Sequence, residues 1–162
     1  MGEQYVELVS VLDPEEAAGT GFGRAVVDCI TVGDRPCGIC AETDHLDAVA
    51  SRLGLEISMG SRIRPDGEVI AWRGAGLDDP RRKSCMPFFI EWRLERDDLY
   101  PGRTPAHHRV PTTSIAWVEV SGDVERLAEW LGGDDLPVRV VDGPPAVRSF
   151  AIGTPDGELV ID

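Results

Sequence analysis

Two acidic side chains, Glu7 and Glu91, lie inside short apolar runs that predict β-strands. Glu7 lies in Tyr-Val-Glu-Leu, and Glu91 lies in Phe-Phe-Ile-Glu-Trp. A carboxylate is costly to bury unless a cation pairs with it, and Arg93 or an arginine on a neighbouring strand is the simplest partner. A structural ion pair is therefore the first interpretation of each acid, and contact with a substrate is the alternative.

Cys37 and Cys40 form a Cys-x-x-Cys motif, which in other contexts indicates zinc binding or redox chemistry. Here the motif opens a predicted strand, where residues three apart face opposite sides. A redox pair normally lies at a helix N-terminus, which lowers the pKa of the thiol. Cys29 and Cys85 each stand alone in the sequence. We therefore expect buried structural thiols.

His107 and His108 lie in a stretch that also contains Arg103 and Arg109. Adjacent side chains of an extended chain diverge, which disfavours metal binding by both histidines. His107 is a candidate general acid–base group, and a solvated loop is the alternative. The sequence contains no phosphate-binding loop, nucleophile elbow or Ser-His-Asp arrangement.

The formal net charge of −13 over 162 residues argues against nucleic acid and anionic membrane surfaces as partners. No apolar run reaches the roughly 18 residues that a spanning helix needs, and we expect a cytoplasmic protein. The charge is uneven, because acidic ends flank a weakly basic stretch at 61–110. That stretch could attract a small anion, although internal charge pairing is the simpler interpretation.

The elements that must position these side chains occur twice. A predicted strand at 37–43 precedes a helix with Leu46, Val49, Ala50 and Leu53 on one apolar face. The same pattern recurs 78 residues later, where a strand at 114–120 precedes a second helix. Both helices end in Ala-x-x-Leu-Gly, and Thr43 or Asp44 is the expected cap of the first. The two matching faces indicate a duplicated unit.

Each helix is followed by three further apolar runs, and Pro-Asp-Gly between two such runs predicts a hairpin in each unit. Each unit therefore has the predicted order strand–helix–strand–strand–strand. The sequence predicts an N-terminal strand plus a helical segment, a first unit, a linker and a second unit. Their boundaries are 1–36, 37–93, 94–112 and 113–162.

The sequences of several segments resemble those of the bacterial glyoxalase-like domain family of the vicinal-oxygen-chelate superfamily. These segments are Tyr-Val-Glu-Leu followed by Asp-Pro-Glu-Glu-Ala, Asp-Ala and Arg-Leu-Gly of the first helix, Arg-Pro-Asp-Gly-Glu-Val, and Met-Pro-Phe-Phe-Ile-Glu-Trp. The resemblance implies an α+β fold in which tandem βαβββ units form a curved mixed sheet. It further implies a small-molecule ligand in the cup of that sheet.

Metal-using members of the superfamily place a histidine on the first strand of a unit and a glutamate on its last strand. The resemblance makes Glu7 and Glu91 weak candidate ligands of a divalent metal. The histidine positions correspond to Cys37 or Gly38 and to a residue near Ala116, so a complete metal site cannot be assembled from matched positions.

Family chains usually open with another βαβββ unit whose last strand corresponds to Tyr5–Val11. We expect that this chain is either a short form or a fragment, and that this strand needs a sheet edge. A second copy could supply that edge, so we expect a homodimer.

The leading hypothesis is a protein of unassigned activity that binds a small organic molecule, which could be an anion. Core packing is the default role of the tryptophans, but Trp92 or Trp117 could line the cup. Glu91, Trp92, Trp117 and Arg93 are the candidate ligand-binding residues. The alternatives are a metal-dependent lyase, isomerase or dioxygenase, and a non-catalytic module that sequesters its ligand.

Overall fold

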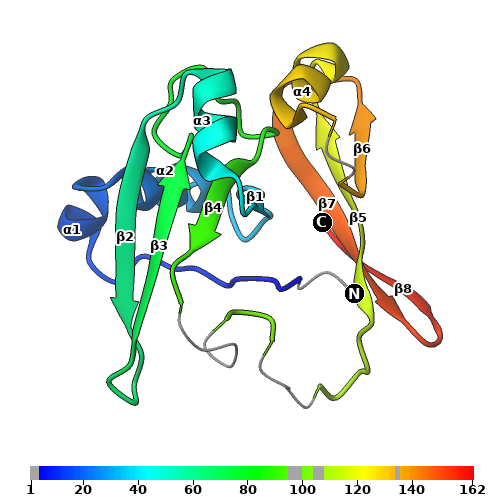
Figure 1. Cartoon of the computed structure of the whole chain (residues 1–162). Helices are drawn as coiled ribbons and strands as arrows, with labels where there is room; N and C mark the ends of the chain where they lie inside the picture. The colour runs from blue at the N-terminus through cyan, green and yellow to red at the C-terminus, as the bar shows by residue number, and fades with distance from the viewer. Residues whose placement is uncertain (1–3, 95–99, 104–107, 134–135) are drawn as a thin grey trace. The chain divides into compact units, whose positions relative to one another are not determined.

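The computed structural model of the chain describes residues 4–94, 100–103, 108–133 and 136–162 (Figure 1). These residues form two compact units, which we describe separately. The first unit contains 40–82, 87–94 and 100–103, and the second contains the remaining described residues.

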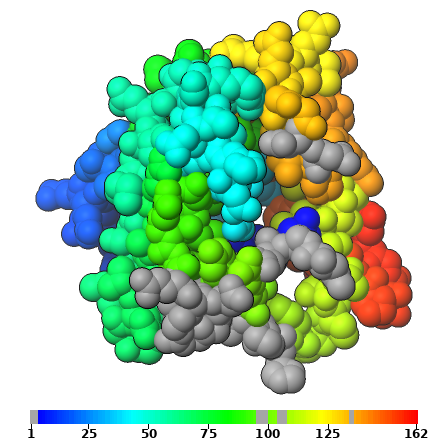
Figure 2. Space-filling view, in the orientation of Figure 1, coloured from blue at the N-terminus to red at the C-terminus, as the bar shows by residue number. Residues whose placement is uncertain are grey.

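The first unit is a four-stranded mixed sheet with one helix. Along the chain its elements are β1 (Cys40–Glu42), α3 (Leu46–Leu53), β2 (Ile57–Ile63), β3 (Val69–Ala75) and β4 (Phe88–Trp92). The strand order is β1-β4-β3-β2, with β1 parallel to β4 and the other pairs antiparallel. In Figures 1 and 2, α3 is the cyan segment that lies over the green strands. We call this sheet the first sheet.

Helix α3 forms where the apolar spacing predicted a helix, and it buries Leu46, Val49 and Ala50. It ends at Gly54, whose φ of 61° is left-handed, as the Leu-Gly ending predicted. The predicted cap was wrong, because His45 occupies the N-cap position and makes no capping hydrogen bond. Thr43, two residues before His45, accepts a 3.1 Å hydrogen bond from the His45 backbone N–H through its hydroxyl oxygen.

The second unit repeats the same order of elements. These are β5 (Ser114–Ser121), α4 (Val124–Leu131), β6 (Val138–Val141), β7 (Ala146–Thr154) and β8 (Gly157–Ile161). The strand order is β6-β5-β7-β8. The Asp123 carboxylate caps α4 by accepting a 3.0 Å hydrogen bond from the Arg126 backbone N–H. The predicted α+β fold of tandem βαβββ units is confirmed, and each unit forms its own four-stranded sheet.

Two further helices precede the first βαβββ unit, α1 (Pro14–Ala18) and α2 (Gly21–Ile30). Asp13 caps α1 with its side chain, and Thr20 caps α2. Helix α2 spans ten residues, within the helical segment that the sequence predicted. Among the described residues, no helix has both the length and the apolar character needed to cross a membrane.

The prediction of a strand at Tyr5–Val11 was wrong. These residues are extended, but they pair with no strand in the described part of the chain. The segment is rich in residues that favour strands, but its side chains are not buried as those of a core strand would be: Leu8 is 94% exposed. Its start is fixed by the side chain of Gln4, whose Oε1 accepts a 2.8 Å hydrogen bond from the Ile115 backbone N–H.

Replacing Gly54 with alanine tests the end of α3. Because Gly54 has a left-handed backbone, a Cβ there should lower the free energy of unfolding by about 1 kcal/mol in urea denaturation. Gly38→Ala is the matched control, because that glycine has no positive φ and open space around its Cβ position. Equal stability of the two variants would contradict the assigned C-cap.

Candidate functional site

The register of the first sheet separates its side chains onto two faces. Arg73 pairs with Glu91 across β3 and β4, and Trp72 pairs with Trp92. Successive residues of a strand point to opposite faces, so the charged pair and the tryptophan pair lie on opposite sides. Arg73 also bonds to Asp47 in the first turn of α3, so the charged pair lies on the face that α3 covers.

The charged face holds a four-member cluster centred on Arg73. Arg73 Nη1 donates to Asp47 Oδ2 at 2.9 Å and to Glu91 Oε2 at 3.0 Å. Arg93 Nη2 lies 2.7 Å from the same Glu91 oxygen. Only 16% of the Arg73 side chain and 14% of the Glu91 side chain are exposed. Glu91 thus has the arginine partners that the cost of burying its charge predicts.

The Asp47 and Arg73 side chains shift each other's proton affinity. The hydrogen bonds from Arg73 hold the pKa of Asp47 below its ordinary value, and the bond to Asp47 raises the pKa of Arg73 above its own. Both groups are therefore charged throughout the neutral range. Arg73 therefore forms an ionic link between α3 and β3 through Asp47.

The opposite face carries aromatic and aliphatic side chains. We call it the tryptophan face and define it by Arg62, Ile70, Trp72, Ile90 and Trp92, which the strand register places on one side. The Trp72 and Trp92 rings are 5.7 Å apart at an interplanar angle of 71°, an edge-to-face arrangement. Both side chains are only partly buried.

Gly60 allows Trp72 to lie across the sheet. Gly60 pairs with Trp72 in the β2–β3 register. A Cβ at Gly60 would collide with the indole ring of Trp72. Any larger residue at this position would push the indole away, so the absence of a side chain here determines where the tryptophan ring lies.

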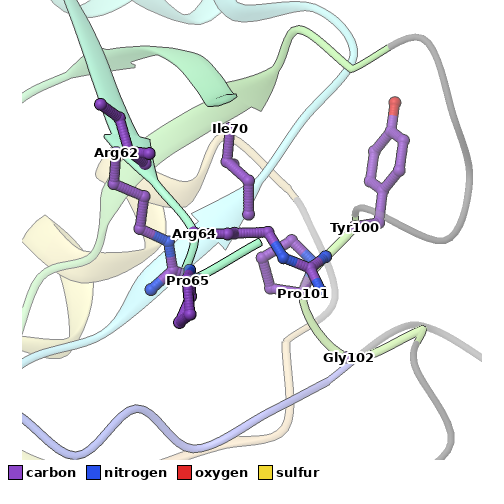
Figure 3. A pocket seen from close by; sticks show the side chains of 8 residues that line it. Arg62, Arg64, Pro65, Ile70, Tyr100, Pro101 and Gly102 are labelled. Atoms are coloured by element: carbon purple, nitrogen blue, oxygen red, sulfur yellow. The ribbon is translucent and has the colours of Figure 1, made fainter. Parts of the chain in front are cut away.

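A pocket of about 380 Å³ opens at the end of this face (Figure 3). Its walls come from the end of β2, the following hairpin, β3 and a separate short segment. The lining residues are Arg62, Ile63, Arg64, Pro65, Ile70, Tyr100, Pro101 and Gly102. All of them belong to the first unit. The volume lies in the range of small-molecule sites, at its lower end.

The hairpin that forms one wall is the predicted Pro-Asp-Gly turn. The Gly67 N–H donates to the Arg64 carbonyl at 2.9 Å, and the Arg64 N–H donates to the Glu68 carbonyl at 2.8 Å. Gly67 has a φ of 88°, which its position in the turn requires. The turn holds Arg64 at the rim, where its guanidinium also pairs with Asp66 at 3.2 Å.

Comparison with known families gives one result. A family model described as a glyoxalase-like domain matches residues 1–134. The chain belongs to the glyoxalase-like domain family. Comparisons with curated proteins and with solved structures gave no match. The matched range ends before β6, so the family match does not extend to β6, β7 and β8.

The structure places the candidate metal ligands of this glyoxalase-like domain in environments that do not fit a metal ion. Glu7 is exposed on the extended N-terminal segment. The Oε2 atom of Glu91 already accepts from Arg73 and lies beside Arg93. In the part of the chain that the structure describes, no three His, Cys, Asp or Glu side chains form a group that could hold a metal ion.

The remaining candidate residues of the domain are dispersed. Trp117 lies in the second unit, where its Nε1 donates to Glu158 at 2.7 Å and the Arg139 guanidinium lies 4.3 Å from its ring centroid. The indole N–H of this tryptophan and one face of its ring are therefore already in contact with protein groups. His107 lies outside the described residues, and His108 is exposed.

Sequence reasoning missed Tyr100 as a lining residue of the candidate site. It follows a charged stretch in the predicted linker, with no periodic pattern to assign it to a face. Arg62 and Arg64 belong to the weakly basic stretch at 61–110, and its charge alone did not single them out. Their alternation with Ile63, just before the Pro-Asp-Gly turn, was the available signal for an arginine-bearing strand end.

The cysteine prediction requires a correction. Cys29 and Cys37 form a disulfide with a Cα–Cα distance of 5.7 Å. The segment after α2 brings Cys37 back to the helix end, within the distance that a disulfide needs. Cys40 carries an exposed thiol, so only Cys85 is the buried thiol that we expected. The Cys-x-x-Cys motif gave no sign of this bond, because the partner of Cys37 is Cys29 in α2 and not Cys40.

The disulfide predicts a thiol count. Protein purified without reductant and unfolded in guanidinium should show two reactive thiols by a colorimetric assay, and four after reduction. Replacing both Cys29 and Cys37 with serine should cost about 2 kcal/mol of stability, because a short closed loop is lost. Cys40→Ser is the control with little expected effect. Four thiols before reduction would contradict the bond.

The Asp47–Arg73 link predicts a pH-dependent loss of stability. Because the folded-state pKa of Asp47 is lowered, its ionised form stabilises the fold above the unfolded pKa. That contribution disappears as the pH falls through the folded pKa. Asp47→Asn should therefore lower the free energy of unfolding at pH 7, and the difference from the parent protein should shrink below about pH 4. Urea denaturation at several pH values measures it, with exposed Asp44→Asn as control. A pH-independent difference would contradict the assignment.

Proposed function

We propose that this glyoxalase-like domain binds a small organic molecule on the tryptophan face of its first sheet. The observation that carries the proposal is the open pocket of about 380 Å³, one wall of which is Ile70 of that face. Ile70 and Trp72 are two residues apart on β3, so a ligand in the pocket lies beside the tryptophan pair.

The tryptophan pair supports binding of an apolar or aromatic body. Trp72 and Trp92 pack edge to face and keep part of their surface exposed. Large aromatic rings supply much contact area and lose little conformational freedom on binding. Of the candidate ligand-binding residues from the sequence, Trp92 is the one that lies on this face.

The composition of the pocket favours binding without acid–base chemistry. The described residues that line it include no carboxylate, histidine or cysteine, the side chains that most often transfer protons in enzymes. The carboxylate of Glu91 lies on the opposite face and is paired with two arginines. A metal-dependent lyase, isomerase or dioxygenase has less support, since the described side chains form no metal-binding group.

Tryptophan fluorescence tests the proposal. A panel of small aromatic and aliphatic compounds should quench the emission of the full chain in a saturable way, because one contact surface is tryptophan. Trp72→Phe should remove most of the change. Trp117→Phe is the matched control and should keep it, since Trp117 is 92% shielded and satisfied by Arg139 and Glu158.

Gly60→Ala gives an independent variant that leaves every tryptophan in place. Its Cβ displaces the Trp72 indole, so we expect weaker binding together with a shifted emission maximum. A saturable response that survives both Trp72→Phe and Gly60→Ala would place the ligand elsewhere and overturn the proposal.

A further inference from the structure

The pocket beside the tryptophan face is cationic although the chain is strongly acidic. Among the residues that the structure describes, the charged side chains that line it are those of Arg62 and Arg64, and the chain has a net charge of −13. A site whose charges are all of one sign, in a protein of the opposite overall sign, attracts the counter-ion locally. The charge of the described lining residues therefore favours an anionic ligand.

The two arginines are not equivalent. Arg64 already pairs with Asp66 at 3.2 Å, and 33% of its side chain is exposed. Arg62 is exposed and makes no ion pair among the residues that the structure describes. Arg62 pairs with Ile70 in the β2–β3 register, so it belongs to the tryptophan face. It is the guanidinium available to a ligand.

The remaining walls are apolar or aromatic. Ile63, Pro65, Ile70 and Pro101 contribute carbon surface, and Tyr100 adds an aromatic ring. In Figure 3 the Tyr100 ring stands on the side of the pocket away from Arg62. The Arg103 guanidinium lies 3.9 Å from the centroid of that ring, which supports it from a neighbouring turn. A ligand that fills this space needs an apolar body as well as a charge.

These features select one class of anion. A planar carboxylate accepts two parallel hydrogen bonds from a guanidinium, and one available arginine matches one negative charge. Inorganic phosphate carries more charge than Arg62 alone can neutralise, and it would leave the isoleucine and proline walls without contacts.

We propose that the pocket formed by the β2–β3 hairpin and Tyr100–Gly102 binds the carboxylate of a small organic acid, which pairs with Arg62 while its apolar body contacts Ile70 and the tryptophan face. The inference rests on the proposed ligand-binding function and adds the ligand class and the residue that selects it.

The test compares matched charged and neutral probes on the full chain. Benzoate and phenylacetate are titrated against benzamide and phenylacetamide, which have nearly the same shape without the charge, and against inorganic phosphate. Isothermal titration calorimetry gives affinities, and tryptophan fluorescence reports contact with the tryptophan face. We expect each acid to bind about tenfold or more tightly than its amide, and phosphate to compete poorly.

The variants assign the effect to Arg62. Arg62→Gln should weaken binding of the acid about tenfold and leave binding of the amide unchanged, and Arg62→Lys should recover part of the loss. Arg35→Gln is the matched control, because it removes the same charge from an exposed arginine of the second unit. It should leave both affinities unchanged.

The outcomes separate this inference from the proposed function. Equal affinities of acid and amide, or an acid affinity that Arg62→Gln does not change, would overturn the carboxylate site while binding on the tryptophan face stands. Phosphate binding as tightly as the acids would overturn the organic-acid class. The absence of any tryptophan response to acids and amides alike would overturn the proposed function itself.

Discussion

The arrangement of the first unit depends on the guanidinium of Arg73. It bonds to Asp47 at the start of α3 and to Glu91 on the neighbouring strand, and so ties the helix to the middle of the sheet. A largely buried carboxylate without such a partner would be costly. By neutralising Glu91, Arg73 allows an acid to lie in an otherwise apolar strand.

This ionic link also determines what each face of the sheet can do. Because Glu91 and Arg73 point toward α3, their neighbours in the register point the other way, and Trp72 and Trp92 therefore share the opposite face. Glu91 is occupied by two cations and lies apart from the pocket lining. Glu91, for which the family resemblance suggested metal binding, is thus held in ion pairs with Arg73 and Arg93, and the tryptophan face lies on the opposite side of the sheet.

The sequence predicted the features that follow from local periodicity and turn chemistry. The apolar face of Leu46, Val49 and Ala50 and its glycine end predicted α3, and Pro-Asp-Gly predicted the β2–β3 hairpin.

The sequence could not predict features that depend on partners distant along the chain. The disulfide joins Cys29 at the end of a helix to Cys37 after an irregular turn, and the adjacent Cys-x-x-Cys text pointed to the wrong pairing. Disulfides persist chiefly in oxidising compartments. Because we expected a cytoplasmic protein, we expected thiols and no disulfide. Tyr100 reaches the pocket from a segment without a repeating pattern, so no sequence signal placed it there.

A double-mutant cycle on Arg73 and Glu91 tests most directly whether this pair supports the first unit. The variants Arg73→Met, Glu91→Gln and their combination are compared with the parent protein by urea denaturation at pH 7. If Glu91 is held as the partner of Arg73, each single change removes the contact between them and leaves a largely buried charge with one partner fewer, Arg93 for Glu91 or Asp47 for Arg73. The double variant then loses less stability than the two single losses combined. Strictly additive losses would contradict the account, because they would show that Glu91 does not depend on Arg73.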